Sequence, residues 1–139
     1  MRYEVTVTID APLERIWEIL VDVERWPEWS ASMSRVERLD PGPFGPGSRA
    51  RIKQPRLPSA IWQVTEFSQG SSFTWVARTP GMTTTAGHTL SPAAGGTELR
   101  LTLHQTGPLA PLVGALAGRL ARRYVDLEAE GLKYDAETP

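Results

Sequence analysis

The chain has 139 residues, no cysteine and a formal net charge of −1 at pH 7. Without thiols it can form no disulfide, no thiolate metal site and no cysteine nucleophile. Its near-neutral charge provides no basic field for nucleic acid or for an anionic membrane surface, so we expect neither partner. A chain of this length can bury the core of one compact domain. With no repeat or linker in the sequence, we predict a single domain over residues 1–139.

Two features of the sequence bear on cellular location, namely the N-terminal residues and the longest apolar run. They begin a strand-like segment and lack the apolar core of a signal peptide. The longest weakly polar run, from Leu109 to Gly118, is far shorter than the roughly 20 residues that span a bilayer. We therefore predict a cytoplasmic protein with no membrane-inserted segment.

The first thirty residues predict a strand followed by two short helices. Apolar and polar residues alternate from Tyr3 to Ile9, as in a half-buried strand. Asp10 is a suitable helix N-cap and Pro12 suits the first helical turn. The helix then presents one apolar face, formed by Ile16, Trp17, Ile19, Leu20 and Val23. A second short helix, broken at Pro27, carries Trp26 and Trp29.

The middle of the chain predicts an antiparallel meander with short turns between its strands. The candidate strands are Met33–Asp40, Ser48–Gln54, Ser59–Phe67, Ser72–Arg78, Met82–Ser91 and Thr97–Thr106. A long helix should begin near Pro108 or Pro111 and end at about Lys133. It has an apolar stripe at helical spacing, formed by Leu109, Val113, Leu116, Leu120, Tyr124 and Leu127.

The opening pattern I-D-A-P-x-E-x-I-W-x-x-L-x-D-x-E-x-W-P-x-W resembles the START-like (SRPBCC) superfamily, in its polyketide cyclase/dehydrase and lipid-transport group. Later segments are similar too, namely Trp62–Val64, Ser72–Trp75, His88–Leu90, Gly96–Leu99 and the closing helix. The resemblance implies an α+β helix-grip fold, in which a curved antiparallel β-sheet wraps around a long C-terminal α-helix. It also implies a cavity, which the cyclases, lipid and quinone carriers and hormone receptors of this family share.

Side-chain parity predicts which residues line that cavity, because alternate residues of a strand face the same side. In the segment Arg49–Gln54 the charged residues alternate with Ala50, Ile52 and Gln54, so the latter set should face inward. The same parity, carried across the hairpins, gives a mostly apolar and aromatic inner face. With residues of the opening and of the closing helix, the predicted ligand-binding set is Trp26, Trp29, Ile52, Gln54, Trp62, Val64, Phe73, Trp75, His88, Leu90, Leu101, Leu116, Leu120 and Tyr124.

His88 and Glu66 are candidates for proton transfer on that inner face. The predicted register puts Phe73 between them, with roughly 9–10 Å between the two outer backbones. An imidazole and a carboxylate beside an apolar cavity can act as acid and base on a ketone or enol, and Tyr124 is a third candidate. The alternative is structural: His88 is a hydrogen-bonded core residue and Glu66 sits in a bulge that turns it outward.

Metal and cofactor chemistry find no support in the sequence. His88 and His104, the two histidines, are predicted on opposite faces of the sheet, so no metal site is expected. There is no Gly-x-Ser-x-Gly motif and no glycine-rich phosphate loop, and we predict no cofactor. The Pro- and Gly-rich segment Pro41–Gly47 reads as a semi-rigid flap in which Phe44 is either a gate residue or an exposed turn residue.

Three functions stay open at this point. The first is a binding protein for a small hydrophobic molecule, such as a polyketide, isoprenoid, quinone or lipid. The second is a polyketide cyclase- or aromatase-like enzyme that uses His88, Glu66 or Tyr124 for proton transfer. The third is an interaction protein whose core is filled by its own side chains. The oligomeric state is also open, a homodimer included.

Overall fold

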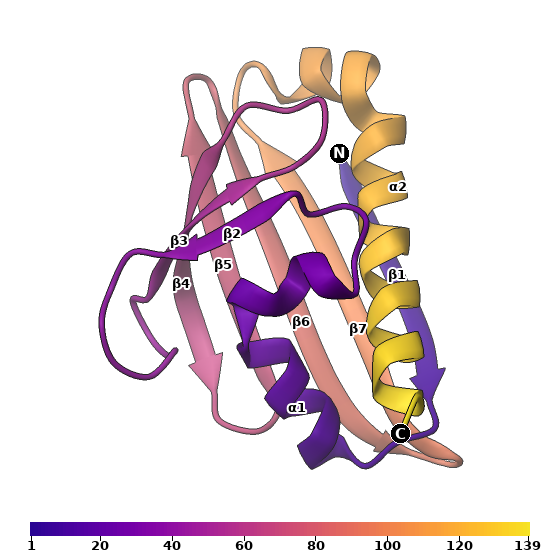
Figure 1. Ribbon diagram of the computed structural model, residues 1–139. Helices are drawn as coiled ribbons and strands as arrows, with labels where there is room; N and C mark the ends of the chain where they lie inside the picture. Colours follow the sequence, from indigo (N-terminus) through magenta and orange to yellow (C-terminus); the bar gives the residue numbers. More distant parts are fainter.

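The computed structural model describes all 139 residues. The elements in chain order are β1 (Arg2–Ile9), α1 (Leu13–Val21), the 3-10 helix η1 (Val23–Glu28), β2 (Arg35–Arg38), β3 (Arg49–Lys53), β4 (Ala60–Ser68), β5 (Ser72–Thr79), β6 (Met82–Ala93), β7 (Gly96–Thr106) and α2 (Ala110–Glu137). The strands form one seven-stranded antiparallel sheet in the order β1-β7-β6-β5-β4-β3-β2 (Figure 1). This is the predicted α+β helix-grip fold.

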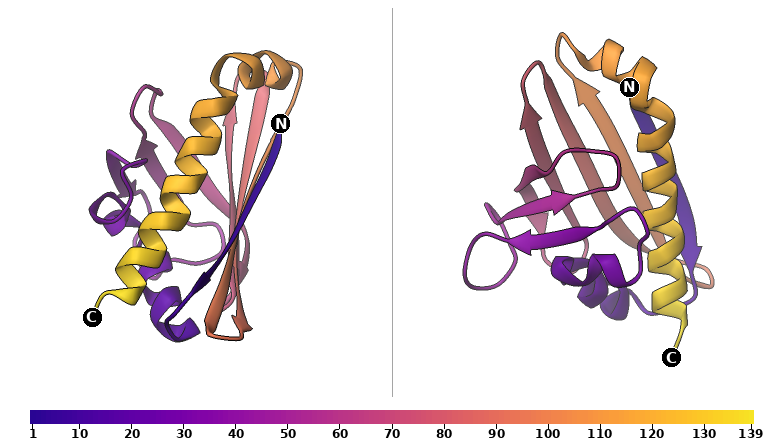
Figure 2. Two further views of the ribbon diagram at one scale, coloured as in Figure 1. Left: turned by 90° about the vertical axis from the view of Figure 1, so that its right-hand side faces the viewer. Right: turned by 45° about the horizontal axis from the view of Figure 1, so that its top comes forward.

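The helices gather on one side of the curved sheet. Figure 2 shows α2 running across the sheet at the β1–β7 edge, with α1 and η1 on the same side. The contacts agree, because α2 packs on β1, β7 and α1. A core of 22 buried apolar residues joins α1, η1, the inner face of the sheet and the C-terminal half of α2.

Helix α1 begins slightly later than the sequence predicts. Pro12 is its N-cap, with an extended backbone (φ −68°, ψ 148°) and no side-chain capping bond, so the expected capping role of Asp10 is wrong. The backbone N–H of Asp10 instead donates to the Glu137 carboxylate at 2.8 Å, which ties the entry of α1 to the end of α2. This bond and the Lys133 ammonium hold the pKa of Glu137 below its usual range.

A β-bulge in β4 breaks the parity that predicted Glu66 on the inner face. Val64 pairs with Trp75, but Glu66 pairs with Thr74 and Phe67 with Phe73, so one extra residue lies between them. A bulge reverses the faces of all later residues in its strand. As a result Glu66 is exposed and Phe67 packs against the core.

The buried face of α2 is rotated from the predicted apolar stripe. Leu112 and Leu116 are 56% and 79% exposed, and Leu109 is also exposed. The residues that α2 buries are Ala110, Gly118, Tyr124, Val125, Glu128, Ala129, Leu132 and Ala136. Even with its exposed leucines, no helix is long and apolar enough to cross a membrane.

Hydrogen bonds to the first strand and to α1 fix that rotation of α2. Asp126 accepts the hydroxyl hydrogen of Tyr3 at 2.7 Å, and this bond raises the pKa of Tyr3. Lys133 donates to the Thr8 carbonyl at 2.7 Å, and Arg15 donates to the Ala136 carbonyl at 2.8 Å. Polar groups on both flanks of α2 therefore select the face that meets the sheet.

Candidate functional site

A cluster of aromatic rings occupies the inner face of the sheet. Trp26 comes from η1, Phe73 and Trp75 from β5, and all three are almost completely buried. The Trp26 ring lies 5.3 Å from Trp75 and 6.4 Å from Phe73 between centroids, and Trp62 of β4 extends the row at 5.9 Å from Trp75. The Trp26 indole N–H is satisfied by the Leu20 carbonyl at 2.9 Å. Large rings in such contact form an apolar wall with little internal freedom.

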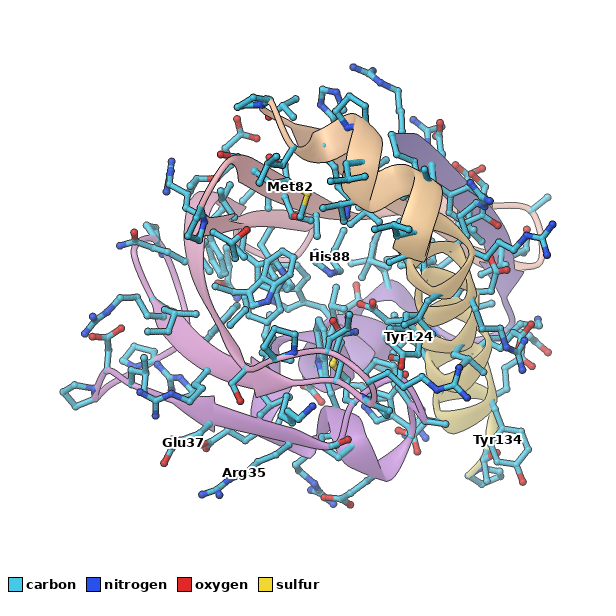
Figure 3. All side chains as sticks on the ribbon, turned by 90° about the horizontal axis from the view of Figure 1, so that it is seen from above. Arg35, Glu37, Met82, His88, Tyr124 and Tyr134 are labelled. Atoms are coloured by element: carbon cyan, nitrogen blue, oxygen red, sulfur yellow. The ribbon has the colours of Figure 1, made fainter.

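His88 is the polar centre of this aromatic cluster. It is 2% exposed and its ring stacks on Phe73, with centroids 4.2 Å apart and an interplanar angle of 15°. Phe73 is also its cross-strand partner, as the sequence predicted. Figure 3 shows His88 in the middle of the molecule, between the sheet and α2.

Both ring nitrogens of His88 have buried partners. Nδ1 lies 3.1 Å from the Phe73 carbonyl oxygen, and Nε2 lies 3.2 Å from Oε1 of Glu128 on α2. A carbonyl oxygen only accepts, so Nδ1 carries a hydrogen. The contact between Nε2 and Oε1 is a buried hydrogen bond between an imidazole and a carboxyl group. Such a pair can give or take a proton while its other bonds stay intact.

Tyr124 links α2 to the loop between β3 and β4. Its side chain is buried, and its hydroxyl donates to the Pro55 carbonyl oxygen. In Figure 3 it lies on the sheet-facing side of α2, whereas Tyr134 points away from the molecule. The hydroxyl of Tyr124 therefore has a structural partner and forms no hydrogen bond with His88.

The structure brings most of the predicted ligand-binding residues together. The buried ones are Trp26, Ile52, Val64, Phe73, Trp75, His88, Leu90, Leu101 and Tyr124. The half-buried ones are Trp29, Gln54, Trp62 and Leu120. Leu116 is wrong as an interior residue, because the rotation of α2 leaves it exposed. Glu66 is wrong as a partner of His88, because the bulge in β4 turns it outward.

Glu128 is the functional candidate that the sequence analysis missed. It stands among the charged residues of the last helix, which read as a solvated face. One signal was present: Glu128 lies four residues after Tyr124, and residues at that spacing share a helix face. A carboxylate on the same face as an inward tyrosine predicts a polar partner in the interior.

Two of the surface pockets lie away from this pair. One of about 270 Å³ is lined mostly by polar and charged side chains near Trp29, and one of about 390 Å³ lies beside Phe44. Neither has His88 or Glu128 in its wall. No group of three or more His, Asp or Glu side chains has the arrangement of a metal site.

Comparison with solved structures places this fold among known ones. A hypothetical protein of Helicobacter pylori superposes with a TM-score of 0.80 at 12% identity, covering 97% of this chain and 86% of that one. The KanY protein superposes with a TM-score of 0.75 at 21% identity, covering 99% of this chain and 97% of KanY. The di-domain ARO/CYC StfQ from the steffimycin biosynthetic pathway superposes at 0.74 with 13% identity, covering 98% of this chain and 50% of StfQ.

The sequence itself matches a family over almost its full length. No curated protein matches the chain. The family model described as polyketide cyclase / dehydrase and lipid transport, however, matches residues 1–137. The chain therefore belongs to the polyketide cyclase/dehydrase and lipid transport family.

Proposed function

We propose that the protein binds a small hydrophobic molecule, of polyketide, isoprenoid, quinone or lipid type, between the sheet and α2. The observation that carries this proposal is the continuous row of rings formed by Trp26, Phe73, Trp75 and Trp62 around one polar pair. Ligand sites for apolar molecules have this composition, with an aromatic wall and few polar groups. The family description, which includes lipid transport, supports the same class of ligand.

Half-buried residues indicate where such a ligand enters. Trp62, Gln54 and Leu120 belong to the predicted inner set but keep part of their surface in solvent. The hydrogen bond from Tyr124 to Pro55 joins α2 to the β3–β4 loop close to these residues. Separation of this contact would widen the space in front of Trp62 and admit a ligand.

Native mass spectrometry of the protein purified from its own host tests this proposal directly. A stoichiometric apolar molecule, released on denaturation and identified by its mass, is the expected result. An empty protein that shows no thermal shift with lipids, quinones or polyketides would contradict it. That result would favour the filled-core alternative and a partner-binding role.

Trp62→Ala should weaken ligand binding at least about tenfold, the equivalent of ~1.4 kcal/mol. The half-buried indole packs against Trp75, so its loss removes wall area from the ligand while the deeper core stays in place. Calorimetric titration with a naphthoquinone and with a medium-chain fatty acid measures the affinity. Ile61→Ala is the matched control, because Ile61 precedes Trp62 in β4, points to the other face and is 47% exposed. Equal losses in both variants would count against the inward role of Trp62.

Cyclase-like catalysis is a second candidate, favoured by the buried hydrogen bond between His88 and Glu128. In an aldol ring closure, a base removes the proton from a carbon between two carbonyl groups, and that carbon forms the new bond to a third carbonyl carbon. The oxygen of that carbonyl takes up a proton. The His88–Glu128 pair could accept the first proton and return one to the oxygen.

His88→Gln should abolish turnover and leave ligand affinity nearly unchanged if this second candidate is correct. Glutamine keeps a polar side chain of similar reach but does not exchange protons near neutral pH. Ring closure of a poly-β-ketone thioester, followed by the absorbance of the aromatic product, measures turnover. Tyr124→Phe serves as the comparison, since it removes the other candidate proton carrier. Unchanged turnover in His88→Gln would remove His88 from the mechanism.

A further inference from the structure

The surface pocket of about 390 Å³ lies between α1, η1, the loop that joins β2 to β3, and the end of β4. We call it the Arg38 pocket. Its apolar wall is formed by Trp17, Val21, Val23, Phe44 and Phe67. Because Trp17 and Phe67 stand edge to face with centroids 5.6 Å apart, aromatic side chains from α1 and β4 form one continuous side of the pocket.

Arg38 is the one cationic side chain in this pocket. Its Nη1 donates to the Gly42 carbonyl at 2.7 Å, whereas its Nε and Nη2 are covered and have no hydrogen-bond partner. The N–H groups of Nε and Nη2 project in parallel from one edge of the guanidinium, which is the geometry that binds acceptor oxygens. Buried donors without a partner are rare, because each carries an uncompensated desolvation cost. This edge of Arg38 therefore offers two N–H donors to a hydrogen-bond acceptor.

The charges around Arg38 favour a neutral acceptor over an anion. Asp22 and Glu24 are also in the wall, so the pocket lining holds two carboxylates and one guanidinium. Glu24 accepts the backbone N–H of Arg38 at 2.9 Å. Asp40 is near as well: its hydrogen bond with Arg49, and then the charge of Arg38, lower the pKa of that carboxyl group. An incoming carboxylate would meet repulsion from these groups, whereas a carbonyl oxygen would not.

Phe44 stands between this pocket and the interior. Its ring lies over Arg38, with 5.8 Å from Cζ to the ring centroid. On its other side it meets Phe73 edge-on, with centroids 5.1 Å apart. Phe44 belongs to the irregular segment between β2 and β3. Because Nε and Nη2 of Arg38 are covered, a ligand reaches them only if a neighbouring side chain such as this ring moves.

We propose that the Arg38 pocket binds a small molecule with a flat apolar body and a neutral carbonyl oxygen. The body lies against Trp17 and Phe67, and the oxygen accepts hydrogen bonds from Nε and Nη2 of Arg38. This site does not rest on the interior site proposed above, because neither Trp17 nor Arg38 belongs to that set.

Three naphthalene probes of similar shape separate the contribution of the carbonyl oxygen to binding from that of the apolar body and from that of a charge. 2-Acetylnaphthalene carries the carbonyl oxygen, 2-ethylnaphthalene lacks it, and 2-naphthoate replaces it with a charged group. Binding to the wild-type protein is followed in ¹H–¹⁵N spectra through the Arg38 Nε–H signal and the indole signals of Trp17 and Trp75. The ketone should bind about tenfold or more tightly than the hydrocarbon, as expected for hydrogen bonds from a charged donor. It should shift the Arg38 and Trp17 signals by more than the Trp75 signal, because only the Phe44 ring links the pocket to Trp75.

Substitution of Arg38 provides the second arm of the test. Arg38→Met keeps the length of the side chain and removes its donors, so the preference for the ketone should fall to within about twofold. Arg35→Met is the matched control on the same strand, because its side chain is 76% exposed, and it should keep the full preference. Equal affinity for ketone and hydrocarbon in the wild-type protein would overturn the proposal. So would shifts confined to Trp75, or tighter binding of 2-naphthoate than of the ketone.

Discussion

Gly131→Ala is expected to destabilise the protein by ~3 kcal/mol, at the upper end of what overpacking costs. A Cβ at this position would lie 1.9 Å from the carbonyl oxygen of Trp29 and 3.0 Å from its carbonyl carbon. These are backbone atoms, so no side chain can swing aside to make room. Helix α2 would have to move away from Trp29, the residue that follows η1. The free energy of unfolding in urea measures the loss.

Gly114→Ala on the same helix is the control with the opposite expected sign. The nearest atom to a Cβ there is Cβ of Met1 at 3.8 Å, which is ordinary contact. Alanine is the better helix former by up to ~1 kcal/mol, so this variant should be slightly more stable than the wild type. Equal losses in both variants would show that close approach to Trp29 is not what requires glycine at residue 131.

Much of the fold could be predicted because it depends on local patterns. Alternation and turn residues placed the strands, and β5 and β6 lie close to the segments Ser72–Arg78 and Met82–Ser91. The hairpin at Pro80–Gly81 is tight, and its register therefore put His88 opposite Phe73 correctly. In these regions the residues of a single hairpin are enough to determine its strands and their register.

The errors arise where distant contacts decide the structure. For Glu66 the structure confirms the alternative reading, a bulge in β4 near Thr65 that turns the side chain outward, over the parity that placed it inside. On α2, leucines occur on more than one face, and the long-range hydrogen bonds from β1 and α1, with the close approach of Gly131 to the Trp29 backbone, set the face that meets the rest of the molecule. The bulge in β4 and the rotation of α2 both depend on contacts between elements far apart in the sequence. Together they place Glu128, and not Glu66, beside His88.

The buried pair of His88 and Glu128 joins the sheet to α2. His88 belongs to the sheet and Glu128 to α2, forty residues later, and both are buried. Removal of one member from a buried pair costs roughly 3–5 kcal/mol, because the other is left without a partner. Replacement of both by apolar residues of similar volume is often neutral or stabilising. The pair can therefore be tested for what it contributes to stability, separately from any chemistry.

A double-mutant cycle of His88→Phe and Glu128→Leu should show strong coupling. Each single variant leaves a buried polar group unpaired, and we expect each to lose ~3 kcal/mol of unfolding free energy. The double variant should return to within ~1 kcal/mol of the wild type, since phenylalanine can keep the stack on Phe73. Glu130→Leu, at an exposed position on the same helix, should change stability by less than ~0.5 kcal/mol. Losses that simply add in the double variant would contradict the coupling.

The same double variant separates structure from function. A protein that replaces the pair with apolar residues and remains folded keeps its aromatic wall, so it should still bind hydrophobic ligands. If the family's cyclase chemistry operates in this chain, the variant should bind the poly-β-ketone thioester and fail to close its ring. Retained ring closure would mean that the His88–Glu128 pair serves stability alone.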